Sequence, residues 1–201
     1  MNLSTRMVVV LTSIGLLSAS FLAAVGLLTK ERIALNKQRE IEEAIIQVVP
    51  GTRSSQKLYE EKDLSVYGGK DKEGALIGFA IHASGVGFQD KITFMLGTNI
   101  SLTRISSLTI LDQKETPGLG AKITDRESFL LYWKNKDCSS TISLRKPAVS
   151  SPDELSPTEI NTITGATISS EAVLNTVNSS LEQVRRLIKE GKLISEEQDA
   201  D

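Results

Sequence analysis

Two stretches of the chain combine glycine with side chains that could hold a ligand. In residues 161–170, hydroxyl groups cluster around Gly165 directly before a long helical pattern, namely Thr164, Thr167, Ser169 and Ser170. A helix that begins here exposes unpaired N–H groups and the positive end of its dipole, which favour a phosphate. Helix capping is the alternative; it explains one or two of the hydroxyls but does not require Gly165 and Ala166.

The second stretch is residues 115–122, with the sequence ETPGLGAK. Pro117 presets φ and Gly118 tolerates a positive φ, which suits the two central positions of a type II turn. Gly120 permits another close approach of the backbone. Such a loop presents N–H groups and one carboxylate, Glu115, to a ligand. From the spacing alone, a simple hairpin turn is the favoured interpretation.

Composition excludes several other kinds of site. The single cysteine, Cys138, and the single histidine, His82, exclude a Cys/His zinc site, an iron–sulfur cluster and a disulfide framework. The spacings GxxxxGK[ST], GxGxxG after a strand, and GxSxG are absent. His82 and Ser84 share a strand face, but a structural role is favoured over catalysis. A net charge of −2 and a sequence pI near 5.6 argue against binding nucleic acid through bulk charge.

The elements that must position these stretches begin with an uncharged apolar run at residues 7–28. As a helix it spans roughly 33 Å, enough for a hydrocarbon core of about 30 Å. A cleaved signal peptide is the alternative, with small residues at 18–20, but its apolar region would be shorter. No cysteine lies near the run, which excludes a lipoprotein anchor. More positive residues follow the span than precede it, and by itself this bias places the following domain in the cytoplasm.

The predicted organisation is an N-terminal tail (1–6), a transmembrane helix (7–28), a juxtamembrane helix (29–50), one domain (51–192) and an acidic tail (193–201). We expect an antiparallel meander between residues 64 and 111, with a turn at 71–74. A short helix at 128–133, a short strand at 141–144 and a proline-rich loop at 146–158 follow. The last helix is expected from Ile168 to about Lys192, with one apolar face. The fold class is therefore α+β.

Taken together, ETPGLGAKI at 115–123 and TGATISS at 164–170 resemble the covalent FMN-binding domain family. The order of features also resembles that family: one anchor, the turn at 71–74, the GVGF segment at 85–88, and the two motifs. Within the family, the chain resembles the G subunits of Rnf-type electron transport complexes. The related C subunits of sodium-translocating NADH:quinone reductases are usually longer.

The resemblance implies that FMN is attached through its phosphate to Thr167. It implies a cofactor site made of Thr164, Gly165, Ala166, Thr167, Ser169, Ser170, Glu115, Thr116, Gly118, Leu119 and Gly120, with the ring near Thr116, Gly118 and Leu119. It implies no catalytic residue of the chain's own and no metal. Tyr132 or Trp133 could stack on the ring, although a core role is favoured for both.

The resemblance further implies partners: the other subunits of an Rnf-type membrane complex, and a flavin transferase that takes FMN from FAD. The transferase pattern resembles D-x-x-[ST]-G-A-T, and this chain has Asn161 at the Asp position. The family's flavin domain lies outside the cytoplasm, against the charge bias noted above; long domains translocate largely regardless of that bias.

The implied function is electron relay that couples ferredoxin and NAD oxidoreduction to sodium or proton export. The chain would be an electron-carrying subunit and not an independent catalyst. Two alternatives stay open: a quinone-reductase subunit or freestanding extracytoplasmic flavoprotein, and a membrane-anchored binding module without redox chemistry.

Overall fold

The computed structural model describes residues 2–193. It contains two compact units, one up to Ile41 and one from Glu42 onwards. The tail expected at 193–201 lies outside the described residues, apart from the buried Leu193.

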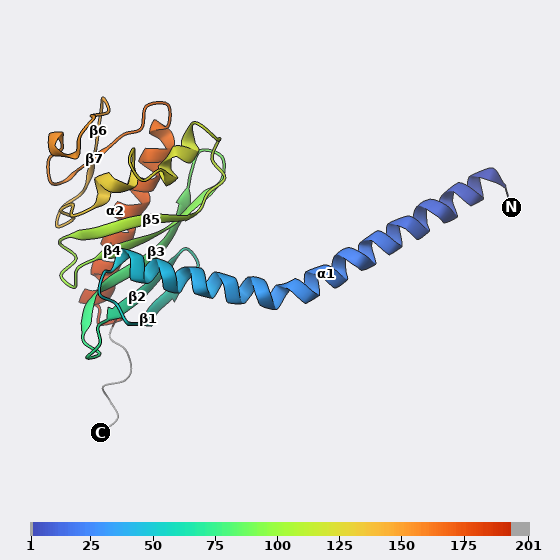
Figure 1. Ribbon diagram of the computed structural model, residues 1–201, viewed down its shortest axis with the longest axis horizontal. Coiled ribbons are helices and arrows are strands. Elements are labelled where there is room, and N and C mark those ends of the chain that lie inside the picture. The colour runs from blue at the N-terminus through green and yellow to red at the C-terminus, as the bar shows by residue number, and fades with distance from the viewer. Residues whose placement is uncertain (1, 194–201) are drawn as a thin grey trace, which may run out of the picture. The chain divides into compact units, whose positions relative to one another are not determined.

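The first unit is formed by one helix, α1 (Leu3–Val48), whose last residues are part of the second unit (Figure 1). It includes the range expected as a transmembrane helix and all but the last two residues of the range expected as a juxtamembrane helix (29–50), and it begins inside the range expected as a tail. Every residue from 7 to 28 is exposed, and the helix is long and apolar enough to cross a membrane. This exposure is what a lipid-facing span requires, because no protein covers its apolar side chains.

The second unit is built on a five-stranded antiparallel sheet in which each strand pairs with its neighbours in sequence. Its strands are β1 (Ser54–Glu61), β2 (Leu64–Lys70), β3 (Leu76–Val86), β4 (Lys91–Thr98) and β5 (Ile105–Asp112). The predicted meander and α+β class are confirmed. At the predicted turn, the Asp71 carboxylate accepts N–H bonds from Glu73 and Ala75. The sequence did not indicate β1, an edge strand whose side chains are mostly exposed.

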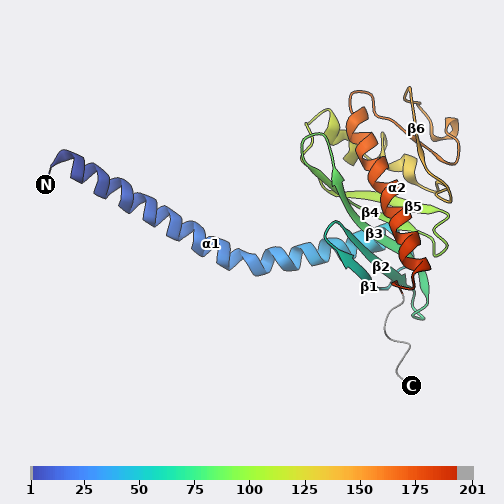
Figure 2. The same ribbon diagram turned by 180° about the vertical axis from the view of Figure 1, so that it is seen from behind.

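One face of the sheet is covered by α2 (Thr167–Lys189), which lies in front of the strands in Figure 2. The helix predicted at 168–192 is confirmed with slightly different ends. Five positions of its predicted apolar face are buried: Val173, Val177, Leu181, Val184 and Leu187. Ile188, assigned to the same face, is 40% exposed. The buried side chains pack on the core-facing residues of the strands, including Phe79 and Ile81 of β3.

The opposite face is covered by residues 42–49, and glycines make room for them. A Cβ on Gly97 of β4 would meet the backbone of Val48, with its carbonyl carbon 2.5 Å away. A Cβ on Gly69 or Gly78 would lie within about 3.2 Å of the Val49 side chain. Val48 and Val49 are consequently almost fully buried.

The segment between β5 and α2 is mostly irregular. It contains η1 (Gly120–Thr124), η2 (Leu130–Trp133), β6 (Ser143–Arg145), η3 (Pro152–Glu154) and β7 (Glu159–Asn161). The helix expected at 128–133 is thus a single 3-10 turn, and the strand expected at 141–144 starts two residues later. β6 pairs in parallel with β7, a partner that three residues of sequence could not reveal.

Candidate functional site

Three segments that are distant in sequence form the walls of a pocket of about 360 Å³. They are the β3–β4 connection, the loop that follows β5, and the start of α2. The lining residues are Phe88, Glu115, Thr116, Leu119, Gly120, Gly165, Ala166, Thr167, Ile168 and Ser169. The volume lies within the range of about 300–1,000 Å³ that small-molecule sites occupy.

The loop after β5 contains the predicted type II turn. The Leu119 N–H donates to the Thr116 carbonyl at 3.1 Å, and Gly118 has a φ of +77°. The hairpin alternative is wrong, because the turn leads into η1 and not into a paired strand. The turn places Leu119 in the pocket wall with half of its surface exposed.

The start of α2 leaves backbone donors at the pocket. Ala166 is the N-cap and makes no side-chain cap bond, and the first N–H to bond within the helix is that of Ser170, to the Ala166 carbonyl. The N–H groups of Thr167, Ile168 and Ser169 therefore precede the helical ladder. Side-chain capping does not account for the hydroxyl cluster. A helix terminus of this kind favours an anion.

Glu115 ties the three walls together. The residue is only 4% exposed, and its Oε1 accepts the N–H groups of Phe88 at 2.8 Å and Gln89 at 3.1 Å. Oε2 accepts the hydroxyl of Ser169, in the first turn of α2, at 2.6 Å. A Cβ on Gly120 would lie 2.5 Å from the Ser169 Oγ and 2.6 Å from Oε2. Glycine is therefore required beside this contact.

The structure brings most of the sequence-predicted residues together. Eight line the pocket: Glu115, Thr116, Leu119, Gly120, Gly165, Ala166, Thr167 and Ser169. Three others lie outside its wall. Thr164 is exposed, Gly118 projects from the turn, and the Ser170 hydroxyl is buried and bonds to the Ala166 carbonyl.

Two residues of the pocket were not among the predicted site residues. Phe88 is 63% exposed and Ile168 is 56% exposed, although both are large and apolar. The sequence offered a signal for Phe88, since it ends the GVGF segment that the family resemblance included. Nothing in the local pattern of Ile168 distinguished it from an ordinary residue of a helical first turn.

Asn161 lies away from the pocket and is 4% exposed. Its Oδ1 accepts the Val149 N–H and its Nδ2 donates to the Val149 carbonyl, both at 2.9 Å. The amide thus acts like a strand partner for the proline-rich loop. Asn178 of α2 forms the same reciprocal pair with the backbone of Ile142, at 3.0 and 2.9 Å.

The remaining candidates are structural. Trp133 is fully buried and packs edge-to-face on Phe129, with ring centroids 5.9 Å apart. Tyr132 is 5% exposed, so neither aromatic faces a ligand. Ser84 shares a hydrogen bond with Thr93 of β4. Cys138 is fully buried, and this burial raises the pKa of its thiol to about 11.

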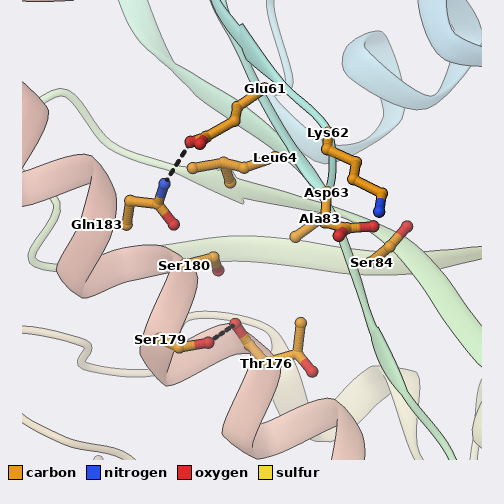
Figure 3. Close-up of a pocket in the computed structure, with 10 residues that line it drawn as sticks. All are labelled: Glu61, Lys62, Asp63, Leu64, Ala83, Ser84, Thr176, Ser179, Ser180 and Gln183. Atoms are coloured by element: carbon orange, nitrogen blue, oxygen red, sulfur yellow. Dashed lines mark hydrogen bonds between the residues drawn. The ribbon is translucent and has the colours of Figure 1, made fainter.

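A second cavity, of about 380 Å³, lies between the β1–β2 hairpin, β3 and α2 (Figure 3). None of the predicted site residues lines it. The hydroxyls on α2 here bond to their own helix backbone, as with Ser179 to the Thr176 carbonyl, and Gln183 donates to Glu61. Because these groups are already satisfied, the cavity offers less to a ligand than the first pocket.

Comparison with known proteins identifies the class. Residues 87–182 match the model of the FMN-binding domain family, and all of the residues that line the first pocket lie inside this range. This part of the chain is similar to an FMN-binding domain.

The relatives narrow the class. The chain is 27% identical over 187 residues to the G subunit of the ion-translocating oxidoreductase complex of Methanosarcina acetivorans, covering 90% of this chain and 94% of that one. It is 29% identical over 130 residues to the G subunit of the Na(+)-translocating ferredoxin:NAD(+) oxidoreductase complex of Acetobacterium woodii, covering 64% and 59%. The recognition of a G-subunit-like FMN-binding protein is confirmed.

Solved structures show the same fold. Shewanella oneidensis NqrC aligns with a TM-score of 0.52 at 19% identity, over 71% of this chain and 74% of that one. The C subunit of the Na(+)-translocating NADH-quinone reductase of Parabacteroides distasonis also aligns with a TM-score of 0.52 at 19% identity, over 72% and 79%. At this identity the likeness concerns the fold.

Proposed function

We propose that the chain is an electron-carrying subunit of an Rnf-type complex and holds FMN as a phosphodiester on Thr167. The observation that carries the proposal is the position of Thr167. It is the first residue of α2, it lines the pocket, and its N–H is one of three that precede the helical ladder. A phosphate attached to its hydroxyl lies beside these donors and the positive end of the helix dipole.

The pocket suits both the flavin ring of FMN and its ribityl phosphate. Phe88, Leu119 and Ile168 present large exposed apolar side chains at its rim, which would lose contact with water against a flavin ring. Gly165, with a φ of +82°, allows the backbone to turn sharply beside the phosphate and ribityl chain. When bound, FMN supplies the redox chemistry; the chain supplies position and electrostatics.

The attachment requires a flavin transferase, which would use FAD. The Thr167 oxygen forms a bond to the phosphorus on the flavin side of the FAD diphosphate. The bond from that phosphorus to the bridging oxygen breaks, AMP leaves, and the hydroxyl proton is released. A covalent link removes dissociation, which suits a domain on the extracytoplasmic side of the membrane.

The proposed task is relay between neighbouring redox centres in a complex that couples ferredoxin:NAD oxidoreduction to sodium or proton translocation. It rests on the G-subunit relatives, whose names state ion translocation and, for one of them, ferredoxin and NAD. The apolar helix α1 supports a single-pass anchor in the membrane, in contact with lipid and the other subunits. Relay by a bound flavin needs no acid or base from the chain.

Three alternatives predict different outcomes. A C-subunit role in a sodium-translocating quinone reductase differs from an Rnf-type role in the proteins that copurify. A freestanding flavoprotein would carry FMN and copurify alone. A binding module without redox chemistry would carry no flavin.

The test is the intact mass of the full chain, coexpressed with a flavin transferase and extracted in detergent, followed by peptide mapping. We expect a gain of one FMN less one water on the peptide that contains Thr167. Thr167→Ala should abolish this gain. Ser179→Ala, which removes an exposed hydroxyl of α2 outside both the transferase pattern and the pocket wall, should retain it. Flavin that persists on Thr167→Ala would refute the attachment site.

A further inference from the structure

We propose that Glu115 is a positioning residue for the flavin pocket, and that its negative charge lowers the reduction potential of the ring held there. The proposal rests on the proposed function for its redox part. Its structural part can be tested without flavin.

The positioning role follows from the three segments that meet at one carboxylate. Phe88 and Gln89 come from the β3–β4 connection, and Ser169 comes from α2, 54 residues further along the chain than Glu115. Charge-assisted bonds of this kind are shorter and stronger than neutral ones. One side chain thus sets the distance between Phe88, on one wall, and the start of α2, on another.

Close packing around the carboxylate supports this role. A Cβ on Gly120 would overlap Oε2, and a Cβ on Gly87 would overlap Oε1. Two glycines on two segments therefore leave space for the same side chain. With Glu115 shortened, the pocket would lose both the bonds and the contact surface that align its walls.

The electrostatic role follows from the environment of the carboxylate, which holds no salt-bridge partner among residues 2–193. The groups within residues 2–193 that donate hydrogen bonds to this carboxylate are neutral, two backbone N–H groups and one hydroxyl, and Glu115 is itself part of the pocket lining. Water is largely excluded at 4% exposure, so the charge is weakly screened. Adding an electron to a ring in this pocket places negative charge near negative charge, and this disfavours reduction.

The choice of variants separates the two roles. Glu115→Gln keeps the shape and an acceptor oxygen for the Phe88 and Gln89 N–H groups, and its amide can donate to Ser169. It removes the charge and reverses the direction of the bond to Ser169, whose hydroxyl donates to Oε2 in the unmodified chain. Glu115→Ala removes both the charge and the bonds. Glu154→Gln is the matched control, because Glu154 also accepts two backbone N–H groups, from Ser150 and Ser151, outside the pocket.

The first measurement is the midpoint potential of the flavin-loaded full chain in detergent, by spectroelectrochemical titration. We expect Glu115→Gln to raise the potential while its flavin load stays near wild type. Glu154→Gln should leave the potential unchanged. An unchanged potential in Glu115→Gln, at normal load, would overturn the electrostatic role.

The second measurement is amide hydrogen exchange of the flavin-free full chain. We expect Glu115→Ala to accelerate exchange at Phe88 and Gln89 roughly tenfold or more, because both N–H groups lose a charged acceptor. Glu115→Gln should restore most of the protection. Unchanged exchange in Glu115→Ala would overturn the positioning role. If wild type carries no flavin, the proposed function fails, yet this exchange still decides whether Glu115 aligns the walls.

Discussion

Asn161 stands at the Asp position of the transferase pattern that the sequence resembles, and its environment predicts what Asn161→Asp will do. The amide both donates to and accepts from the Val149 backbone, and it is 4% exposed. A carboxylate retains the acceptor but loses the donor. It also turns an oxygen toward the Val149 carbonyl oxygen, and neither group can reach water easily.

The expected cost follows from the bond that is lost. A buried acceptor left without its donor costs about 1–3 kcal/mol, and more when a charge is involved. For a chain of this size, each kcal/mol corresponds to about 2–4 °C in Tm. A loss of about 2 kcal/mol would thus lower the Tm by about 4–8 °C at pH 8.

The cost should also depend on pH. Burial and the facing carbonyl raise the folded-state pKa of the introduced carboxyl above its unfolded value of about 3.9. The protonated acid can donate to Val149, so the loss is small at low pH and grows as pH rises through the raised pKa.

The assay is thermal unfolding of the full chain in detergent at pH 4.5 and pH 8, followed by fluorescence of Trp133, the single tryptophan. Asn178→Asp is the matched control, because Asn178 makes the same pair with Ile142 but is only half-buried. It should lose less stability. If Asn161→Asp matches wild type at pH 8, the amide pair does not stabilise the loop. Flavin load measured on both variants shows whether Asp at 161 improves recognition by the transferase.

Two further predictions concern the domain away from the site. Gly97→Ala should destabilise the domain by about 1–3 kcal/mol, because the added Cβ overlaps the Val48 backbone. Gly26→Ala is the control, because its added Cβ meets nothing within 4 Å. Equal Tm values for the two variants would contradict the packing of residues 42–49 on the sheet. Cys138 should resist thiol alkylation at pH 8 in the folded chain and should react in urea. The reason is that its side chain is fully buried, which raises the thiol pKa to about 11. Rapid labelling without urea would show that the thiol is accessible.

Much of the fold was predictable because its signals are local. Short runs of β-type residues between turn signals indicated β2–β5, and helical spacing indicated α2. The turn at residues 116–119 was predictable because Pro117 and Gly118 restrict their own backbone angles. In contrast, β1 consists mostly of polar residues and is a strand only because β2 offers it an edge. The pairing of β6 with β7 depends on a loop that neither strand encodes.

In the site too, local sequence signals were predictable and contacts between distant segments were not. The sequence by itself determined the apolar helical segment at residues 7–28, the hydroxyl cluster before α2, and the turn beside it, because hydropathy, helix termini and proline–glycine pairs act over a few residues. Only the tertiary structure decided that Phe88 and Ile168 join the pocket. It also decided that Asn161 is a buried partner of Val149, and that Glu115 turns its carboxylate to two other segments. These contacts join residues far apart along the chain, so they exist only once the sheet has brought its loops together.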